Sequence, residues 1–199
     1  LSYTLTSNGV DGVFGNIDDI EISNGIMTSK GKYYVEGGGS DNILFTSSFS
    51  NMDGLNTLMG DWDVLDNTLK PSTEEYANRI IFGNESWEDY TIEIDATLTD
   101  LNSDESGGYG IYYRASRNEV SYGLDGYIFQ YDPGLGDRFA VNKVSGGVSE
   151  DRIDTIKMTD IKEDFNIYNT SHQVKIDVQG NQHTISITDE EGNEYEVFS

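Results

Sequence analysis

The chain has 199 residues, of which 36 are acidic and 12 basic, so its formal net charge at pH 7 is −24. This charge repels phosphate backbones and anionic lipid head groups, and we expect neither nucleic acid nor direct membrane contact. The chain has no cysteine, which removes disulfides, thiolate nucleophiles and cysteine-bound zinc.

Apolar and polar residues alternate through the chain, which is the pattern of strands with one buried face, and no sustained helical pattern is present. Turn-forming pairs such as Asn24-Gly25, Asp125-Gly126 and Gly180-Asn181 separate the predicted strands. This pattern predicts an all-β fold, a two-sheet antiparallel β-sandwich. The predicted strands are residues 16–23, 31–36, 43–49, 62–65, 79–82, 90–98, 110–115, 127–131, 138–144, 173–178, 183–188 and 195–198.

Residues 43–71 combine a strand ending in Phe-Ser, a loop, and the pattern Gly-x-Trp-x-Val-x-Asp-Asn-x-Leu, which begins at Gly60. This segment resembles the opening of the concanavalin A-like jelly rolls found in laminin-G-like domains and related carbohydrate-binding modules. The segments GYGIYYRA, GYIFQYDPG and HQVKIDVQGNQHTISIT extend the resemblance over residues 43–199. The resemblance implies a jelly roll with a carbohydrate-binding or adhesive role.

The order of segments departs from that family, whose members usually close on a strand of the form Phe/Ile-Asp-Asp/Asn-Val/Ile-x-Val/Ile. The corresponding sequence, GNIDDIEIS, lies near the start of this chain. A circular permutation would explain this order, because domain termini often lie close together. Residues 1–199 would then form one sandwich, in which residues 1–23 supply closing strands and residues 24–42 connect them. In the alternative, residues 1–40 end a preceding domain and residues 41–199 form the sandwich.

Residues 107–134 suggest a binding face, because two strands there carry polar residues in the same phase. Alternate residues of a strand point to opposite faces. If the more aromatic sets form the core, the remaining polar set shares the outer face. In the resembling family this face is concave, and an Arg and a Gln in equivalent motifs line a glycan groove. The predicted ligand-binding residues are Tyr112, Arg114, Gln130 and Asp132.

The chemistry of these side chains suits a neutral glycan. Arg and amide groups make paired hydrogen bonds to vicinal hydroxyls, and a Tyr ring covers the apolar face of a pyranose. The alternative is a structural role, in which Arg114 and Asp132 form a cross-strand ion pair.

Catalysis is not expected. Glu93 and Asp95 share a strand face in TIEIDATL, which resembles the Glu-x-Asp-x-x-Glu signature of glucanases built on the jelly roll. Leu98 occupies the position of the final Glu, so a general acid/base is missing. His172 and His183 accompany no catalytic cluster, and we predict that both are surface residues. A glycoside hydrolase-related enzyme is therefore the least favoured interpretation.

Asp18 is the candidate metal ligand. The strand phase that buries Ile20 and Ile22 also turns Asp18 inward, and a buried carboxylate needs a cation or several hydrogen bonds. Many jelly-roll modules hold a structural Ca²⁺ at such an Asp, so the resemblance implies Ca²⁺ as a cofactor. Hydrogen bonds from backbone amides are the alternative.

Two classes of function remain. The first is a non-catalytic carbohydrate-binding or adhesive module of a secreted or cell-surface bacterial protein, with a glycan or cell-surface carbohydrate as its partner. The second is the structural head domain of a pilin-like surface subunit, whose partners are other subunits. The acidic, cysteine-free composition resembles Gram-positive surface proteins, including type IV pilin-like ones. Both classes imply an extracellular or cell-surface location, with any export signal or anchor outside this sequence.

Overall fold

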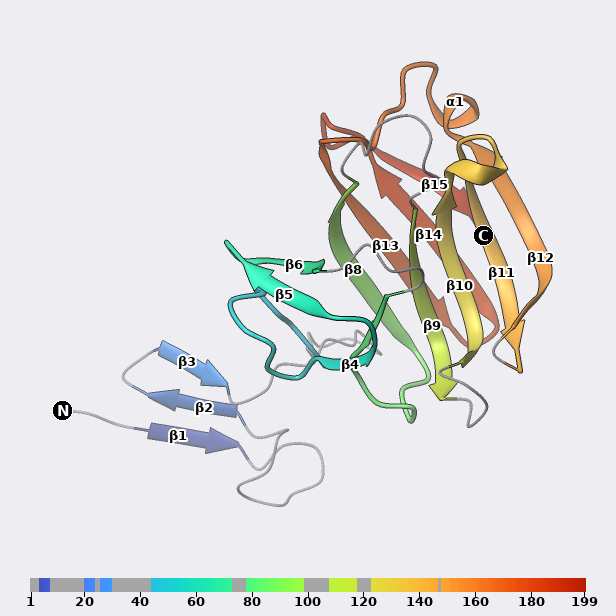
Figure 1. Ribbon diagram of the computed structural model, residues 1–199. Helices are drawn as coiled ribbons and strands as arrows, with labels where there is room; N and C mark the ends of the chain where they lie inside the picture. The colour runs from blue at the N-terminus through green and yellow to red at the C-terminus, as the bar shows by residue number, and fades with distance from the viewer. Residues whose placement is uncertain are drawn as a thin grey trace. The chain divides into compact units, whose positions relative to one another are not determined.

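Antiparallel strands make up most of the computed structural model, which describes residues 4–7, 20–23, 26–29, 44–72, 78–98, 108–117, 123–146 and 148–199. Its strands are grouped in two units, Leu1–Asn84 and Glu85–Ser199. Both units are built from antiparallel pairs (Figure 1). The prediction of an all-β antiparallel fold is confirmed.

The described residues of the unit Leu1–Asn84 form three small sheets. One has the order β1-β2-β3, a second pairs β4 with β7, and the third is the hairpin of β5 and β6. Asp66 and Asn67 connect the hairpin with φ of 52° and 57°, the left-handed values that a two-residue hairpin turn requires. The strands are β1 (Thr4–Ser7), β2 (Ile20–Ser23), β3 (Ile26–Ser29), β4 (Asn56–Met59), β5 (Trp62–Leu65), β6 (Thr68–Pro71) and β7 (Arg79–Ile81).

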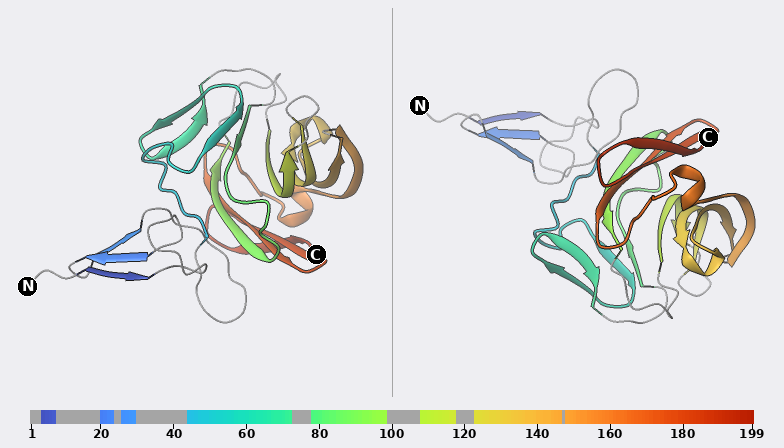
Figure 2. Two further views of the ribbon diagram at one scale, coloured as in Figure 1. Left: turned by 90° about the horizontal axis from the view of Figure 1, so that it is seen from below. Right: turned by 90° about the horizontal axis from the view of Figure 1, so that it is seen from above.

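The unit Glu85–Ser199 consists of two four-stranded sheets that stack face to face (Figure 2). We call the sheet of order β12-β11-β10-β9 the front sheet and the sheet of order β15-β14-β13-β8 the back sheet. Its strands are β8 (Tyr90–Thr97), β9 (Tyr109–Arg117), β10 (Leu124–Asp132), β11 (Arg138–Ser145), β12 (Val148–Lys157), β13 (Ser171–Gln179), β14 (Gln182–Thr188) and β15 (Glu194–Phe198). Two short helices, η1 (Pro133–Leu135) and α1 (Met158–Ile161), follow β10 and β12.

Aromatic residues of the front sheet fill the space between the two sheets. Phe129 and Phe139 stack with their ring centroids 5.6 Å apart, and both are 0% exposed. Phe129 also meets Phe198 of the back sheet edge to face at 6.2 Å. Val174 and Ile176, from the centre of the back sheet, are likewise 0% exposed. The prediction that the more aromatic strand faces form the core is therefore confirmed.

His172 belongs to this core, so the prediction of a surface position is wrong for it. The side chain is 3% exposed, and its Nε2 shares a 2.8 Å hydrogen bond with the Tyr109 hydroxyl. The reason is visible in the alternation of β13, because His172 continues the inward phase of Val174 and Ile176. His183 is partly exposed, but its Nε2 is buried against the rings of Tyr113 and Tyr127.

Asp125-Gly126 is not a turn, contrary to the prediction, because both residues lie inside β10. The pairing of β9 with β10 shifts register between Asp125 and Tyr127, so that Arg114 and Ala115 lie opposite Gly126 alone. Two residues opposite one is a β-bulge, which local Gly conformations favour. Arg114 has φ of 46° there, so the regular alternation of β9 ends at this residue.

The strands near the N-terminus pair with one another. β2 pairs with β1 on one side and β3 on the other, and β15 pairs with β14. Most of residues 24–42 lie outside the described part of the chain. The circular permutation stays a prediction. Among the described residues, no helix is long and apolar enough to cross a membrane.

Candidate functional site

The outer face of the front sheet, turned away from the core, carries three of the four predicted ligand-binding residues. The strand registers define this face, because directly paired residues lie on the same side of a sheet. One row joins Tyr112, Ile128, Asn142 and Arg152 across the four strands. The next row joins Gly110, Gln130, Ala140 and Thr155, and a third joins Asp132, Arg138 and Lys157.

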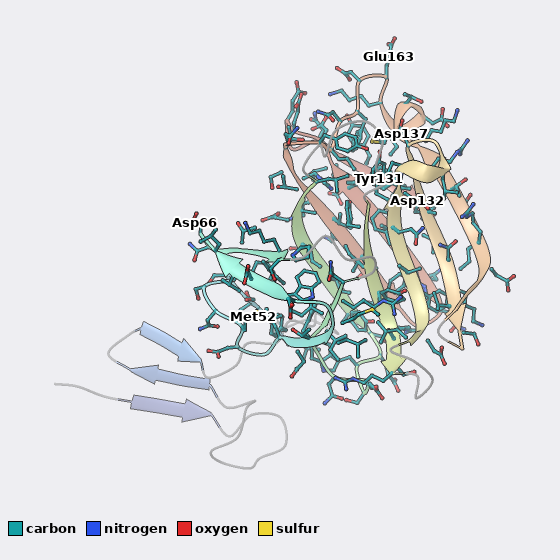
Figure 3. The ribbon with its side chains drawn as sticks, viewed as in Figure 1. Met52, Asp66, Tyr131, Asp132, Asp137 and Glu163 are labelled. Carbon is teal, nitrogen blue, oxygen red and sulfur yellow. The ribbon has the colours of Figure 1, made fainter. Side chains whose placement is uncertain are left out.

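Tyr112, Gln130 and Asp132 are brought together on this outer face, and each is partly exposed. The Gln130 Nε2 donates to the Asp132 Oδ2 at 3.4 Å, so the amide and carboxylate form one polar group along β10. Asp132 lies where β10 ends and η1 begins (Figure 3). Tyr112 lies on the neighbouring β9, opposite Ile128. These three side chains form a polar surface with an aromatic ring at one margin.

Arg114 does not join them, because the β-bulge redirects it toward the start of β8. Its Nη2 donates to the Glu88 carbonyl at 2.8 Å and lies 3.5 Å from the Asp89 Oδ1. Its backbone N–H donates to the Tyr90 hydroxyl at 2.5 Å. Arg114 thus forms an ion pair with Asp89 rather than with Asp132, and it joins the edges of the two sheets.

Asn142 is a candidate site residue that sequence reasoning missed. It lies at the centre of the outer face, between Ile128 on β10 and Arg152 on β12, and is 3% exposed. Within the described part of the chain, its Oδ1 accepts no hydrogen bond. Leaving a buried acceptor unpaired costs about 1–3 kcal/mol, so native folds rarely retain one without a reason. A usable signal was present: Asn142 interrupts the apolar run of β11 in the outward phase.

The carboxylates Glu93 and Asp95 lie on the other sheet. Both project from β8 on the outer face of the back sheet, where they are exposed. The Lys175 Nζ lies 3.6 Å from the Glu93 Oε1, and the Gln173 Nε2 donates to the Asp95 Oδ1 at 3.5 Å. Each carboxylate therefore has a structural partner on β13.

The two imidazoles give the protein a predicted acid sensitivity. Burial lowers the pKa of His172 below its ordinary value of 6.5, and burial also lowers the pKa of His183. A His with a lowered folded-state pKa stabilises the fold fully above pH about 6.5 and loses this contribution as the pH falls below it. We expect the free energy of unfolding, measured in urea between pH 8 and 5, to fall by up to about 1.4 kcal/mol per pH unit through the buried imidazole of His172.

A His172→Gln variant separates this effect from the titration of the many carboxylates. The difference in unfolding free energy between wild type and variant should shrink as the pH falls from 8 to 5. A difference that is constant over this range would show that His172 does not titrate differently in the folded protein.

The predicted metal ligand, Asp18, lies outside the described residues. In the described ranges, no group of three or more His, Asp or Glu side chains is arranged to hold a metal ion. Calcium binding at Asp18 stays a prediction.

The chain matches no protein-family model, no curated protein and no solved structure. The resemblance to concanavalin A-like jelly rolls therefore rests on the sequence motifs alone.

Proposed function

We propose that the protein is a non-catalytic carbohydrate-binding or adhesive module, and that the outer face of the front sheet binds the glycan. The observation that carries this proposal is the amide oxygen of Asn142, a buried acceptor on the outer face of the front sheet that has no donor among the described residues. A sugar presents many hydroxyl donors, and such a donor would satisfy this oxygen. Because its net charge is −24, the protein repels long anionic polymers, which are therefore disfavoured as ligands.

The neighbouring side chains supply the other contacts that a sugar needs. The Gln130 amide can both donate to and accept from hydroxyls, and the Asp132 carboxylate accepts from them. The Tyr112 ring lies at the margin of the same face, where it can cover the apolar side of a pyranose. Binding through few contacts is expected to be weak.

The remaining parts of the proposal follow from the sequence motifs. The fold would be a concanavalin A-like jelly roll, with its strand order permuted, in a bacterial protein that is secreted or held at the cell surface. The absence of catalysis is supported by the pairing of Glu93 and Asp95 with Lys175 and Gln173. A structural Ca²⁺ at Asp18 would belong to the same proposal.

A glycan array followed by titration calorimetry tests the proposed function. Asn142→Ala and Gln130→Ala should each weaken binding about 5- to 10-fold, the value of one net hydrogen bond. Asn142→Ala should leave the melting temperature unchanged or raised, because it removes a buried amide oxygen that no donor of the described residues satisfies. Gln173→Ala, which removes an amide from the outer face of the back sheet, is the matched control and should bind as wild type.

Two results would contradict the proposal. Binding that survives both Asn142→Ala and Gln130→Ala would place the glycan elsewhere. No binding across the array would favour the structural head of a pilin-like surface subunit. That second candidate is favoured by Arg114, because its guanidinium holds the edges of the two sheets together instead of facing a ligand.

A further inference from the structure

Two cations lie side by side on the outer face of the front sheet. Arg138 on β11 and Lys157 on β12 are directly paired in the sheet register. Directly paired residues of antiparallel strands have their Cβ atoms about 4.5–5.5 Å apart, and like charges in this position destabilise the sheet. The pairing is unexpected in a chain with 36 acidic and 12 basic residues.

Neither cation is neutralised by a carboxylate of the described residues. The four ion pairs formed there involve Arg114, Lys162 and Lys175, but not Arg138 or Lys157. Asp132 lies opposite Arg138 on β10, yet its carboxylate accepts from the Gln130 amide instead of from Arg138. Among the described residues, Arg138 and Lys157 therefore form no ion pair, although Asp132 lies opposite Arg138 in the same row.

The Arg138 guanidinium is held in place by a neutral partner. Its Nη1 donates to the Thr155 Oγ1 at 3.3 Å, across the strand boundary between β11 and β12. This bond uses one of its five N–H donors and leaves the others for a further acceptor. Lys157 is exposed, so its ammonium can turn toward the same acceptor.

We propose that Arg138 and Lys157 bind the carboxylate of an acidic sugar, so that the ligand is a glycan containing a uronate unit. The guanidinium takes the carboxylate through paired N–H donors, and the ammonium adds a second positive charge. The rest of the glycan extends along β10 and β11 toward Gln130 and Asn142, which lie one and two rows away. This inference rests on the proposed function, because it assigns one end of the same face.

The charge of the whole protein limits the ligand further. A net charge of −24 repels a polyanion at long range, whereas one carboxylate meets two cations at short range. The ligand is thus a glycan with isolated uronate units instead of a densely sulfated chain. Nucleic acids are disfavoured for the same reason.

The experiment compares neutral glycans with their uronate analogues. The array carries glucose, galactose and mannose oligosaccharides beside the same oligosaccharides with one residue oxidised at C6 to the acid, and hits are titrated by calorimetry at 0.15 M NaCl. We expect the uronate form to bind about 5- to 10-fold more tightly than its neutral partner. Arg138→Gln and Lys157→Gln should each reduce this preference, and together they should abolish it. Lys157 is exposed, so its replacement should leave the fold intact.

Lys175→Gln is the matched control, because it removes one positive charge from the outer face of the back sheet. It should leave the preference unchanged. Equal binding of neutral and acidic forms, or a preference that survives the double substitution, would overturn this inference and leave the proposed function standing. If Lys175→Gln also lost the preference for the uronate form, this inference would be overturned, because the preference would then depend on the net charge of the protein. No binding of any glycan would overturn both.

Discussion

Asp189→Ala is expected to lower the melting temperature of the protein by on the order of 5–10 °C. The carboxylate is 4% exposed and organises the turn between β14 and β15. Its Oδ1 accepts from the backbone N–H groups of Glu191 and Asn193 at 3.0 and 2.8 Å. Its Oδ2 accepts from the Lys162 Nζ at 3.2 Å and the Tyr195 hydroxyl at 3.1 Å. Removing the carboxylate leaves these four donors without their acceptor.

The effect of Asp189 depends on pH in a defined direction. The side-chain hydrogen bond from Asn193, with the backbone N–H of Asn193 and the donors of Lys162 and Tyr195, holds the pKa of Asp189 well below its ordinary value of 3.8. A carboxyl with a lowered folded-state pKa stabilises the fold above its unfolded pKa and loses this contribution as the pH falls. The difference in melting temperature between wild type and Asp189→Ala should therefore narrow between pH 6 and pH 3.

Asp164→Asn is the control for Asp189→Ala. Asp164 lies 3.6 Å from the same Lys162 Nζ, but its side chain is 78% exposed. An exposed ion pair contributes little, so this substitution should shift the melting temperature by about 1 °C or less. Equal melting curves for the two variants would show that the turn does not depend on the buried carboxylate. Circular dichroism at 218 nm, where strand content is followed, measures both.

The fold was predictable from the sequence where the alternation is regular. Val174, Ile176 and Val178 on β13 repeat with a period of two and are buried. The same period extends to His172, whose titratable side chain predicts a surface position while its phase in β13 predicts a buried one. In the interior a neutral imidazole hydrogen-bonded to Tyr109 is tolerated, so phase decides its position.

The candidate site was less predictable from the sequence. It depends on the β-bulge that redirects Arg114, and on the Asn142 Oδ1, which has no hydrogen-bond donor among the described residues. Alternation alone places Arg114 beside Tyr112, but the β-bulge opposite Gly126 turns Arg114 toward Glu88. An Asp-Gly pair is compatible with a hairpin turn and with a β-bulge, so the local residue preferences of Asp125-Gly126 do not distinguish the two structures. Asn142 could not be identified from the sequence, because finding an acceptor without a donor requires the three-dimensional positions of the donors around it.

Gly126→Ala should destabilise the protein by about 3 kcal/mol or more, which corresponds to a fall in melting temperature of about 6–12 °C. Gly126 has φ of +147°, which residues with a Cβ atom rarely adopt. An added Cβ would lie 2.6 Å from the Arg114 carbonyl oxygen and 2.8 Å from the Ala115 Cα. Both contacts are with backbone, so no side-chain rotation can relieve them, and the bulge must change its geometry.

A rearranged bulge has a consequence beyond lower stability. Arg114 would lose the position from which it binds the Glu88 carbonyl and Asp89, so the edges of the two sheets should open together. Amide hydrogen exchange should therefore speed up at the start of β8 as well as in β9 and β10. Gly146→Ala is the matched control, because Gly146 also has a positive φ, of 63°, but a Cβ there would meet nothing within 4 Å. If both variants melt alike, backbone strain alone explains the loss; if only Gly126→Ala exposes β8, the bulge is what joins the two sheets through Arg114.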